Sequence, residues 1–311
     1  MSSRILVCGL GSIGKRHLAN VIEASPHSEI AILRTQGPMV NLPRVLTCFQ
    51  ELDKALDFCP EVVIIASPAS LHVAQAIAFS ECANRILIEK PISTTLKEAR
   101  HLQESLDSKQ CRVIVGYNLR YFGSLQRFRE FILKGKYGRL IRLEAHVGQH
   151  LSTWRADRDP SESVSCRRDL GGGVFRELSH EIDYCLWICG LPHNVRARKS
   201  RHLGYGDAED CVDLWMEFPG GAHAALHMDM IDRSRRRTLR AICQDATIEL
   251  DFITGVININ GKAEGETKSS TDTYKLELED LLHGRTEPLG ATYQDGVSVL
   301  EVIEAAEEDA Q

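Results

Sequence analysis

Residues 4–14 read Arg4-Ile5-Leu6-Val7-Cys8-Gly9-Leu10-Gly11-Ser12-Ile13-Gly14, and this stretch decides the fold. The apolar run over residues 4–8 predicts a buried β-strand, and the periodic apolar positions of residues 13–24 predict a helix directly after it. The three glycines stand in the spacing G-x-G-x-x-G. Between a strand and a helix, the first glycine permits a tight turn and the second lets a ligand approach the backbone. The third lets the helix pack close to the strand.

The start of the predicted helix is a candidate anion site. Its first N–H groups have no partner within the helix, and the helix dipole adds a partial positive charge there. In this context the glycine loop indicates a site for the pyrophosphate of a dinucleotide, although a glycine turn without a ligand is the alternative. The candidate cofactor-binding residues of the loop are Gly9, Gly11, Ser12, Ile13 and Gly14.

The remainder of the first half repeats the alternation of strand and helix. Near-continuous apolar strands separated by helices indicate a parallel sheet that is buried on both faces. Right-handed crossovers between such strands give a doubly wound sheet. The predicted strands cover residues 29–33, 61–66, 85–88 and 112–115, and the predicted helices cover residues 71–80 and 96–108.

The pattern changes near Gly116-Tyr117, after which polar and apolar residues alternate. This alternation predicts half-exposed antiparallel strands, and Gly220-Gly221 predicts a hairpin turn between two of them. The predicted strands cover residues 140–147, 211–218, 222–230, 239–243 and 246–252, and the predicted helices cover residues 124–134, 174–188 and 293–307. We therefore expect an α/β protein, with a Rossmann domain over residues 1–117 and an α+β domain with an open, mainly antiparallel sheet over residues 118–311.

The end of the second predicted strand bears on which nicotinamide cofactor binds. Folds that bind NAD carry Asp or Glu there, because a carboxylate accepts hydrogen bonds from the ribose hydroxyls. This strand leads instead into Arg34-Thr35, and a guanidinium can pair with the 2′-phosphate of NADP. We expect NADP in preference to NAD, with Arg34 and Thr35 as cofactor-binding residues. The alternative is that Arg34 is a solvated loop residue.

Composition limits the class of protein. Hydrophobic residues make up 43% and charged residues 26%, which is typical of a globular protein and excludes disordered or collagen-like chains. The net charge of −6 argues against nucleic-acid or anionic-membrane partners. The ten cysteines form no C-x-x-C pair, so we expect no metal site. No apolar run is long enough for a signal peptide or a membrane span, and we expect a cytoplasmic protein.

Five motifs follow one another along the chain. They are the glycine loop extended by Arg16-His17, the segment Ala66-Ser67-Pro68-Ala69-Ser70-Leu71-His72, the tripeptide Glu89-Lys90-Pro91, the segment Gly116-Tyr117-Asn118-Leu119-Arg120-Tyr121, and Gly171-Gly172-Gly173 followed by Glu177, His180 and Asp183. Their order and spacing resemble the Gfo/Idh/MocA family, which includes glucose–fructose oxidoreductase and inositol dehydrogenase. The resemblance covers essentially the whole chain and implies a two-domain oxidoreductase with a nicotinamide cofactor.

The resemblance assigns roles beside the nicotinamide. Lys90 would touch the reacting hydroxyl at the carboxyl edge of the sheet, where ligands of doubly wound folds bind. Its ammonium would stabilise developing alkoxide character as hydride leaves. In relatives the bond between this lysine and the following proline is often cis. The cofactor contacts implied for this region are Ser67, Pro68, His72, Glu89 and Lys90.

Glu177, His180 and Asp183 stand three residues apart and would share one face of a helix. His180 is the expected proton acceptor, because histidine titrates near neutral pH, and Glu177 would orient the substrate or His180. Many family members place the first acid four residues before the histidine instead of three. The lost residue would rotate Glu177 by about 100° around the helix. An alternative is that Glu181 occupies the usual place of the histidine.

Other polar residues are candidates for the substrate pocket. The implied substrate-binding residues are Asn118, Arg120, Trp154, Arg155 and Asp183, and Trp154 offers a face on which a sugar can stack. His150, Asp157 and Arg168 are further candidates. For each of these three, a position in a surface loop without a ligand is the alternative.

The expected reaction is reversible hydride transfer between nicotinamide C4 and a carbinol or carbonyl carbon of a sugar or sugar derivative. Similarity to members associated with surface-polysaccharide biosynthesis suggests a nucleotide sugar. The alternatives are an NAD-dependent glycosidase of the same family and a non-catalytic, cofactor-sensing regulatory protein. Because an open sheet leaves one face to be covered, we also expect a homodimer or homotetramer.

Overall fold

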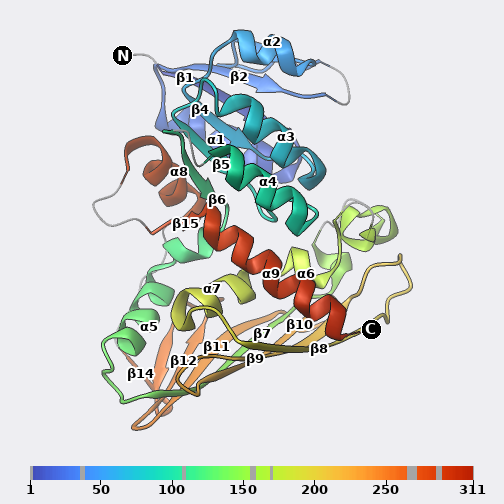
Figure 1. The fold of residues 1–311 in the computed structure, drawn as a ribbon. Helices are drawn as coiled ribbons and strands as arrows, with labels where there is room; N and C mark the ends of the chain where they lie inside the picture. Colours follow the sequence, from blue (N-terminus) through green and yellow to red (C-terminus); the bar gives the residue numbers. More distant parts are fainter. Residues whose placement is uncertain are drawn as a thin grey trace. The chain divides into compact units, whose positions relative to one another are not determined.

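The structure is a computed structural model that describes residues 3–35, 39–106, 110–154, 159–168, 171–264, 272–284 and 289–310. The backbone forms two compact units (Figure 1). One unit combines Met1–Tyr121 with Thr271–Val297, and the other combines Phe122–Ser270 with Ser298–Gln311. The expected contiguous domains, residues 1–117 and 118–311, therefore differ from the units in two respects. The boundary falls after Tyr121. In addition, a segment from late in the chain returns to the first unit, because its helix packs into the core of that unit.

The first unit is built on a seven-stranded sheet with the order β15-β6-β5-β4-β1-β2-β3. Strands β1 to β6 pair in parallel, whereas the short β15 pairs antiparallel with β6. This order confirms the doubly wound sheet, and the short strands β3 and β15 are the ones in this sheet that the sequence did not predict. The strands are β1 (Arg4–Cys8), β2 (Glu29–Leu33), β3 (Thr47–Phe49), β4 (Val62–Ile65), β5 (Arg85–Ile88), β6 (Arg112–Val115) and β15 (Ala291–Thr292).

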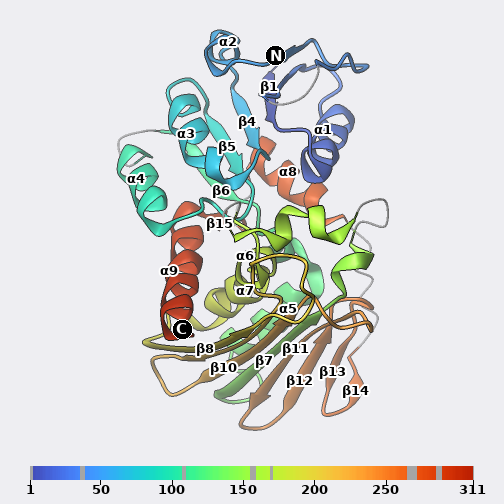
Figure 2. The ribbon, with the colours of Figure 1, turned by 90° about the vertical axis from the view of Figure 1, so that its right-hand side faces the viewer.

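Helices cover both faces of this sheet, with α1 and α8 on one face and α3 and α4 on the other (Figure 2). The predicted helices after the first, fourth and fifth strands are confirmed, although residue 108 lies outside the described residues. Helix α8 was not predicted. Its Leu278 and Leu281 join Ile5, Val7 and Leu18 in the core. The helices are α1 (Ser12–Ala24), α2 (Leu52–Asp57), α3 (Ala69–Phe79), α4 (Leu96–Leu106) and α8 (Thr273–His283), with a short 3-10 helix over Asn118–Tyr121.

The second unit contains an eight-stranded sheet with the order β14-β13-β12-β11-β7-β10-β9-β8. The pairs are antiparallel except for β10 with β7, so the expected mainly antiparallel sheet is confirmed. Gly220 and Gly221 have φ angles of 91° and 85° in the turn between β9 and β10. The strands are β7 (Leu140–Gly148), β8 (Asn194–Ser200), β9 (Cys211–Glu217), β10 (His223–Asp229), β11 (Arg236–Cys243), β12 (Thr247–Asp251), β13 (Ile257–Ile259) and β14 (Lys262–Ala263).

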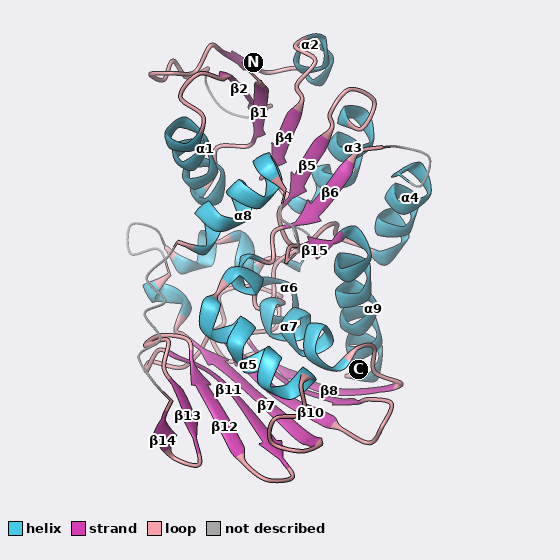
Figure 3. Ribbon diagram, turned by 90° about the vertical axis from the view of Figure 1, so that its left-hand side faces the viewer, coloured by secondary structure: helices cyan, strands magenta, loops and turns pink. Residues whose placement is uncertain are grey.

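One face of this sheet is covered by α5 (Gly123–Leu133), α6 (Val174–Glu177) and α7 (His180–Cys189), as Figure 3 shows. Alternate residues of the strands point to that face and are buried, whereas the residues between them are half-buried or exposed. Helix α9 (Tyr293–Asp309) ends the described chain. Among the helices that the structure describes, none is both long enough and apolar enough to cross a membrane.

The predicted helix over residues 174–188 is wrong as a single element. It breaks after Glu177, where Leu178 takes φ −105° and ψ 25°, and a new helix begins at His180. The hydrogen-bond ladder restarts with the Asp183 amide donating to the Ser179 carbonyl. Glu177 therefore lies on a different helix from His180 and Asp183. The rotation of about 100° expected for Glu177 on one regular helix does not describe this backbone.

Candidate active site

The glycine loop has the geometry that its spacing predicts. Gly9 has φ +91°, and a Cβ there would lie 2.5 Å from the Ala66 carbonyl oxygen. A Cβ on Gly14 would lie 2.2 Å from the Gly9 carbonyl oxygen. The first and third glycines are therefore required for the close contact of the turn, helix α1 and the end of β4.

Gly11 differs from its two neighbours in the motif. No atom of the described chain lies within 4 Å of the position that its Cβ would take. Gly11 is also the N-cap residue of α1, and no side chain caps this helix end. The open space and the uncapped N–H groups, with Ser12 and Ile13 in the first turn, fit the pyrophosphate of a dinucleotide.

Arg34 and Thr35 follow β2 directly, at the same edge of the sheet as the glycine loop. The Arg34 amide donates a 2.8 Å hydrogen bond to the Phe49 carbonyl, which continues the pairing of β2 with β3. Arg34 is half-buried and Thr35 is exposed. The backbone position expected for a residue beside the adenosine ribose is therefore occupied by an arginine.

His72 joins the loops that follow β4 and β5. Its Nε2 lies 2.8 Å from the Ser67 carbonyl oxygen, and its Nδ1 lies 2.9 Å from the Pro91 carbonyl oxygen. Burial lowers the pKa of His72, although the two carbonyl groups oppose that shift. Ser67 also donates a 2.7 Å hydrogen bond to Gln75, so the loop before α3 is held at two points, while Pro68 is exposed. The side chain of His72 thus has a positioning role beside the predicted nicotinamide site.

Glu89 and Lys90 stand at the carboxyl end of β5. The Glu89 carboxylate is buried and lies 2.7 Å from Nε2 of His17 on α1. Its other oxygen accepts a 3.2 Å hydrogen bond from the Lys90 amide, and the Lys90-Pro91 bond is cis. Glu89, expected as a cofactor contact, is thus bonded to protein groups, and it fixes the backbone from which the half-buried Lys90 side chain extends.

Glu277 on α8 adds an acid to this region that the sequence did not single out. Its side chain is fully buried, and neither carboxylate oxygen has a hydrogen-bond partner among the described residues. Burial raises its pKa well above the ordinary value, and the nearby charges of Glu89 and Asp280 add to the shift. The protonated form of Glu277 is therefore favoured beside the Glu89–His17 pair. The sequence carries no signal for it, because a glutamate on an amphipathic helix is ordinarily exposed.

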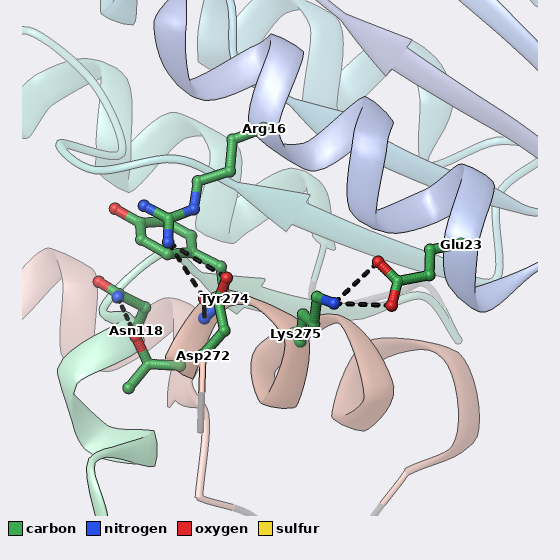
Figure 4. A network of polar contacts seen from close by, with 7 residues as sticks. Arg16, Glu23, Asn118, Asp272, Tyr274 and Lys275 are labelled. Atoms are coloured by element: carbon green, nitrogen blue, oxygen red, sulfur yellow. Dashed lines mark hydrogen bonds and ion pairs between the residues drawn. The ribbon is translucent and has the colours of Figure 1, made fainter. Parts of the chain in front are cut away.

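Helix α8 is tied to α1 by polar contacts at its start (Figure 4). Arg16 lies 3.2 Å from Asp272, and its guanidinium stands 4.2 Å above the centre of the Tyr274 ring. Lys275 pairs with Glu23 at 2.7 Å. These contacts hold α8, and with it Glu277, against the helix that carries His17.

Asn118 and Arg120 were expected in the substrate pocket. Both are buried within the first unit. Asn118 donates a 2.6 Å hydrogen bond to Thr273, as Figure 4 shows, and Arg120 lies 3.2 Å from Asp295. These contacts bind the returning segment of the chain to the end of β6, and the substrate role of both residues stays a prediction.

The second unit holds the other predicted catalytic residues at the junction of α6 and α7. Glu177 accepts a 2.6 Å hydrogen bond from Ser165. His180 and Asp183 are buried, with 9% and 1% of their surfaces exposed, in the first turn of α7. The carboxylate of Glu181 is bound by Arg237 through contacts of 2.8 Å and 3.0 Å. That bidentate ion pair accounts for Glu181 without a catalytic role, and it favours His180 as the proton acceptor.

The remaining substrate candidates lie in loops of the second unit. Trp154 is half-buried and donates a 3.0 Å hydrogen bond from its indole nitrogen to the Gln149 carbonyl. His150 caps a short 3-10 helix by accepting from the Ser152 amide. Arg168 lies 3.7 Å from Glu307. Arg155 and Asp157 lie outside the described residues.

Comparison with known proteins identifies the family. Residues 3–117 match the model of an oxidoreductase family with an NAD-binding Rossmann fold. Residues 125–249 match the model of the GFO/IDH/MocA C-terminal domain. The chain belongs to the Gfo/Idh/MocA family of oxidoreductases.

Curated relatives lie at low identity. The rhizopine catabolism protein MocA of Rhizobium meliloti is 26% identical over 260 residues, which are 79% of this chain and 74% of that protein. An NADP-linked scyllo-inositol 2-dehydrogenase of Bacillus subtilis is 22% identical over 215 residues, 69% of this chain and 59% of the relative. The chain spans about half the length, 46% and 48%, of two uncharacterised oxidoreductases of Schizosaccharomyces pombe that it also matches.

Solved structures share the whole fold. UDP-N-acetylglucosamine 3-dehydrogenase from Acidithiobacillus ferrooxidans superposes with a TM-score of 0.81 at 22% identity, over 100% of this chain and 98% of that one. Levoglucosan dehydrogenase, in complex with NADH and levoglucosan, superposes with a TM-score of 0.82 at 19% identity, over 100% of this chain and 97% of that one. At these identities the likeness establishes the fold and leaves the substrate to be argued.

The glycine contacts predict losses of stability of different size for two alanine variants. Gly14→Ala places a methyl group against the Gly9 carbonyl and should lower the free energy of unfolding by about 1–3 kcal/mol or more. Gly11→Ala has room for its methyl group and should cost about 1 kcal/mol or less, the effect of a poorer N-cap. Urea denaturation followed by circular dichroism measures both. Equal losses in the two variants would contradict the packing described here.

Proposed function

We propose that this protein is an NAD(P)-dependent dehydrogenase that acts on a hydroxyl-bearing carbon of a sugar or sugar derivative. The observation that carries the proposal is the position of Lys90 at the carboxyl edge of a doubly wound sheet. The buried Glu89 carboxylate fixes the backbone of Lys90 there. Ligands of this fold class bind at that edge. The nicotinamide, when bound, accepts or returns the hydride at C4.

The roles of the protein residues follow from their chemistry. The Lys90 ammonium orients the substrate oxygen and stabilises the negative charge that grows on it during hydride transfer. His180 takes the hydroxyl proton or returns it, and Asp183 and Glu177 orient the histidine and the substrate. The bond from Ser165 to Glu177 limits the positions that this carboxylate can reach.

NADP is the proposed cofactor. Support comes from the arginine that directly follows β2, where NAD-specific folds carry an acid, and from the NADP-linked relative in Bacillus subtilis. The levoglucosan dehydrogenase complex contains NADH, so both cofactors occur among proteins of this fold. The distinction in this chain therefore depends on Arg34.

A nucleotide sugar is the proposed substrate class. The chain shares its fold, over its full length, with a dehydrogenase of UDP-N-acetylglucosamine. Its segments from Gly116 to Tyr121 and from His180 to Tyr184 are similar to those of members associated with surface-polysaccharide biosynthesis.

Loss of the Lys90 charge should lower turnover far more than it weakens cofactor binding. Lys90→Met is expected to lower kcat about 10²–10³-fold, because one donor to the developing oxyanion is removed. NADPH binding, measured by fluorescence, should persist with only a modest rise in Kd, because Lys90 is one of several predicted cofactor contacts. Lys97→Met, at an exposed position of α4, is the matched control and should retain full activity. Full activity of Lys90→Met would refute the assignment.

The same measurements separate the alternatives. A dehydrogenase reduces one equivalent of cofactor for each sugar oxidised. A glycosidase of this family would release an aglycone without net reduction, and its cofactor would stay bound through purification. A regulatory protein would bind cofactor and turn over no sugar, so a loss of turnover in Lys90→Met would exclude that function.

Arg34→Ala should change cofactor preference. The guanidinium would make a charge-assisted contact with the 2′-phosphate worth about 1.5–3 kcal/mol, so the KM for NADP should rise about 10–100-fold. The KM for NAD should change little, and NAD is thus the internal control in a steady-state assay. An equal change for both cofactors would show that Arg34 does not contact the phosphate.

We also propose that two copies of the chain pair through the sheet face of the second unit that α5–α7 leave uncovered. This face carries both signs of charge, for example Arg142 at 2.9 Å from Glu144 and Arg240 at 3.0 Å from Glu249, and is therefore self-complementary. Ala225→Arg, at the half-buried centre of the face, should shift the sedimentation mass from dimer or tetramer toward monomer. Leu133→Arg, exposed on α5, is the control that should not. A monomeric wild-type protein would refute the proposal.

A further inference from the structure

Three potential metal ligands gather at one end of strands β7 and β10. The parallel register pairs His227 with His146 and Asp229 with Gly148. One ligand atom from each of His146, His227 and Asp229 lies within 4.8 Å of the other two. The residues alternate with the buried positions of their strands, so their side chains belong to the face opposite α5–α7. Figure 3 shows these two strands side by side in the sheet.

One distance within the cluster is compatible with a metal site. Nε2 of His227 lies 3.2 Å from Oδ2 of Asp229. Two ligands of a tetrahedral zinc ion, each about 2.0–2.1 Å from the metal, are roughly 3.3 Å apart. These two atoms are therefore already separated by about one edge of a coordination tetrahedron.

A further carboxylate orients His227. Asp213 on β9 lies 2.7 Å from Nδ1 of His227. Nδ1 therefore donates to Asp213, and Nε2 faces Asp229, where a bound cation would replace the proton of that nitrogen. A carboxylate that binds the second nitrogen of a ligating histidine is the common arrangement around zinc, and it raises the basicity of the ligand.

Asp229 is held by its own loop. Its Oδ1 accepts hydrogen bonds of 2.8 Å and 2.6 Å from the amides of Ile231 and Asp232. Oδ2 faces Gly148, where a Cβ would lie 2.6 Å from it and 3.2 Å from Oδ2 of Asp232. The glycine thus makes room for the two carboxylates of Asp229 and Asp232.

Hydrogen bonds within the cluster leave one nitrogen of His146 without a partner among the described residues. A proton shared between His227 and Asp229 would satisfy those two residues. Nε2 of His146 is buried and has no hydrogen-bond partner among the described residues. Its ring centre lies 4.9 Å from that of His227. A cation bound by both rings would satisfy this nitrogen.

The local charge also favours a cation. Asp213, Asp229 and Asp232 contribute three negative charges. Arg236, which pairs in register with Gly148, and Arg198, which pairs in register with Asp213, contribute two positive charges, so the acids exceed the arginines by one. Imidazole nitrogens with carboxylate oxygens are ligands that zinc and related divalent ions prefer, whereas magnesium and calcium prefer oxygen alone.

We propose that His146, His227 and Asp229 bind one divalent transition-metal ion, for which Zn²⁺ best fits the donor set, with water as the fourth ligand. The ion links the carboxyl ends of β7 and β10 and stabilises the second unit. The site uses no residue assigned to the cofactor or to hydride transfer, so it does not depend on the proposed reaction. It lies on the sheet face proposed for pairing of two copies, so the sedimentation mass of each variant is measured beside its Zn²⁺ binding.

Direct binding to the full chain tests the proposal. Protein stripped with a chelator should bind one Zn²⁺ per chain in isothermal titration calorimetry, and Co²⁺ in its place should give the strong visible absorption of a tetrahedral complex. Zn²⁺ should also raise the midpoint of thermal unfolding, because it binds only the folded state. The proposal is overturned if the wild-type protein binds no more Zn²⁺ than the His146→Gln variant does.

Three variants separate this site from adventitious binding to surface histidines. His146→Gln should weaken Zn²⁺ binding more than tenfold and abolish the rise in the unfolding midpoint. Asp213→Asn keeps the shape of the side chain but removes the negative charge beside Nδ1 of His227. It should weaken Zn²⁺ binding about 10–100-fold. His223→Gln is the matched control, since His223 lies on the same face of β10 and stacks on Trp215 at 4.5 Å. Equal affinities for His146→Gln and His223→Gln would show adventitious binding and refute the site.

Discussion

The first unit depends on a close approach of backbone to backbone at the glycine loop. Gly9 touches the end of β4, and Gly14 touches Gly9, at distances where no side chain fits. This contact sets α1 against the sheet with its uncapped N-terminus at the carboxyl edge. The loops after β4 and β5 reach the same edge, because parallel strands all end there. The position of Lys90 is therefore a consequence of the packing of the first turn.

The buried carboxylates of Glu89 and Glu277 are the second constraint on the structure around Lys90. Glu89 is bonded to His17 and to the Lys90 amide, and Glu277 lies beside it with a raised pKa. Two ionised carboxylates in one buried place would repel each other strongly, and burial with the charge of Glu89 therefore favours the protonated form of Glu277. Helix α8 supplies this residue, and the ion pairs of Arg16 and Lys275 hold the helix in place. The cofactor end of the protein is thus completed by a segment from late in the chain.

Helices and strands were predicted correctly where a short, continuous stretch of sequence carries a clear pattern. Strands β1, β2, β5 and β6 matched their expected bounds, because continuous apolar runs between turns have few other interpretations. Strand β3 has three residues, too few for a pattern to show. Helix α8 carries charged residues among its leucines, and its burial of Glu277 reverses the usual preference of that residue. The break between Glu177 and His180 was missed because residues 174–188 keep a helical pattern across it.

The sequence by itself determined the fold class, the glycine loop, the strand-end lysine and the family. Each can be recognised from short motifs whose residues are neighbours in the chain. Only the tertiary structure decided which of these groups are already paired. It bonded Glu89 to His17, Glu181 to Arg237 and Asn118 to Thr273, and it gathered His146, His227 and Asp229 from two strands. The physical reason is that pairing depends on distances across the fold, and a residue's type and spacing do not contain those distances.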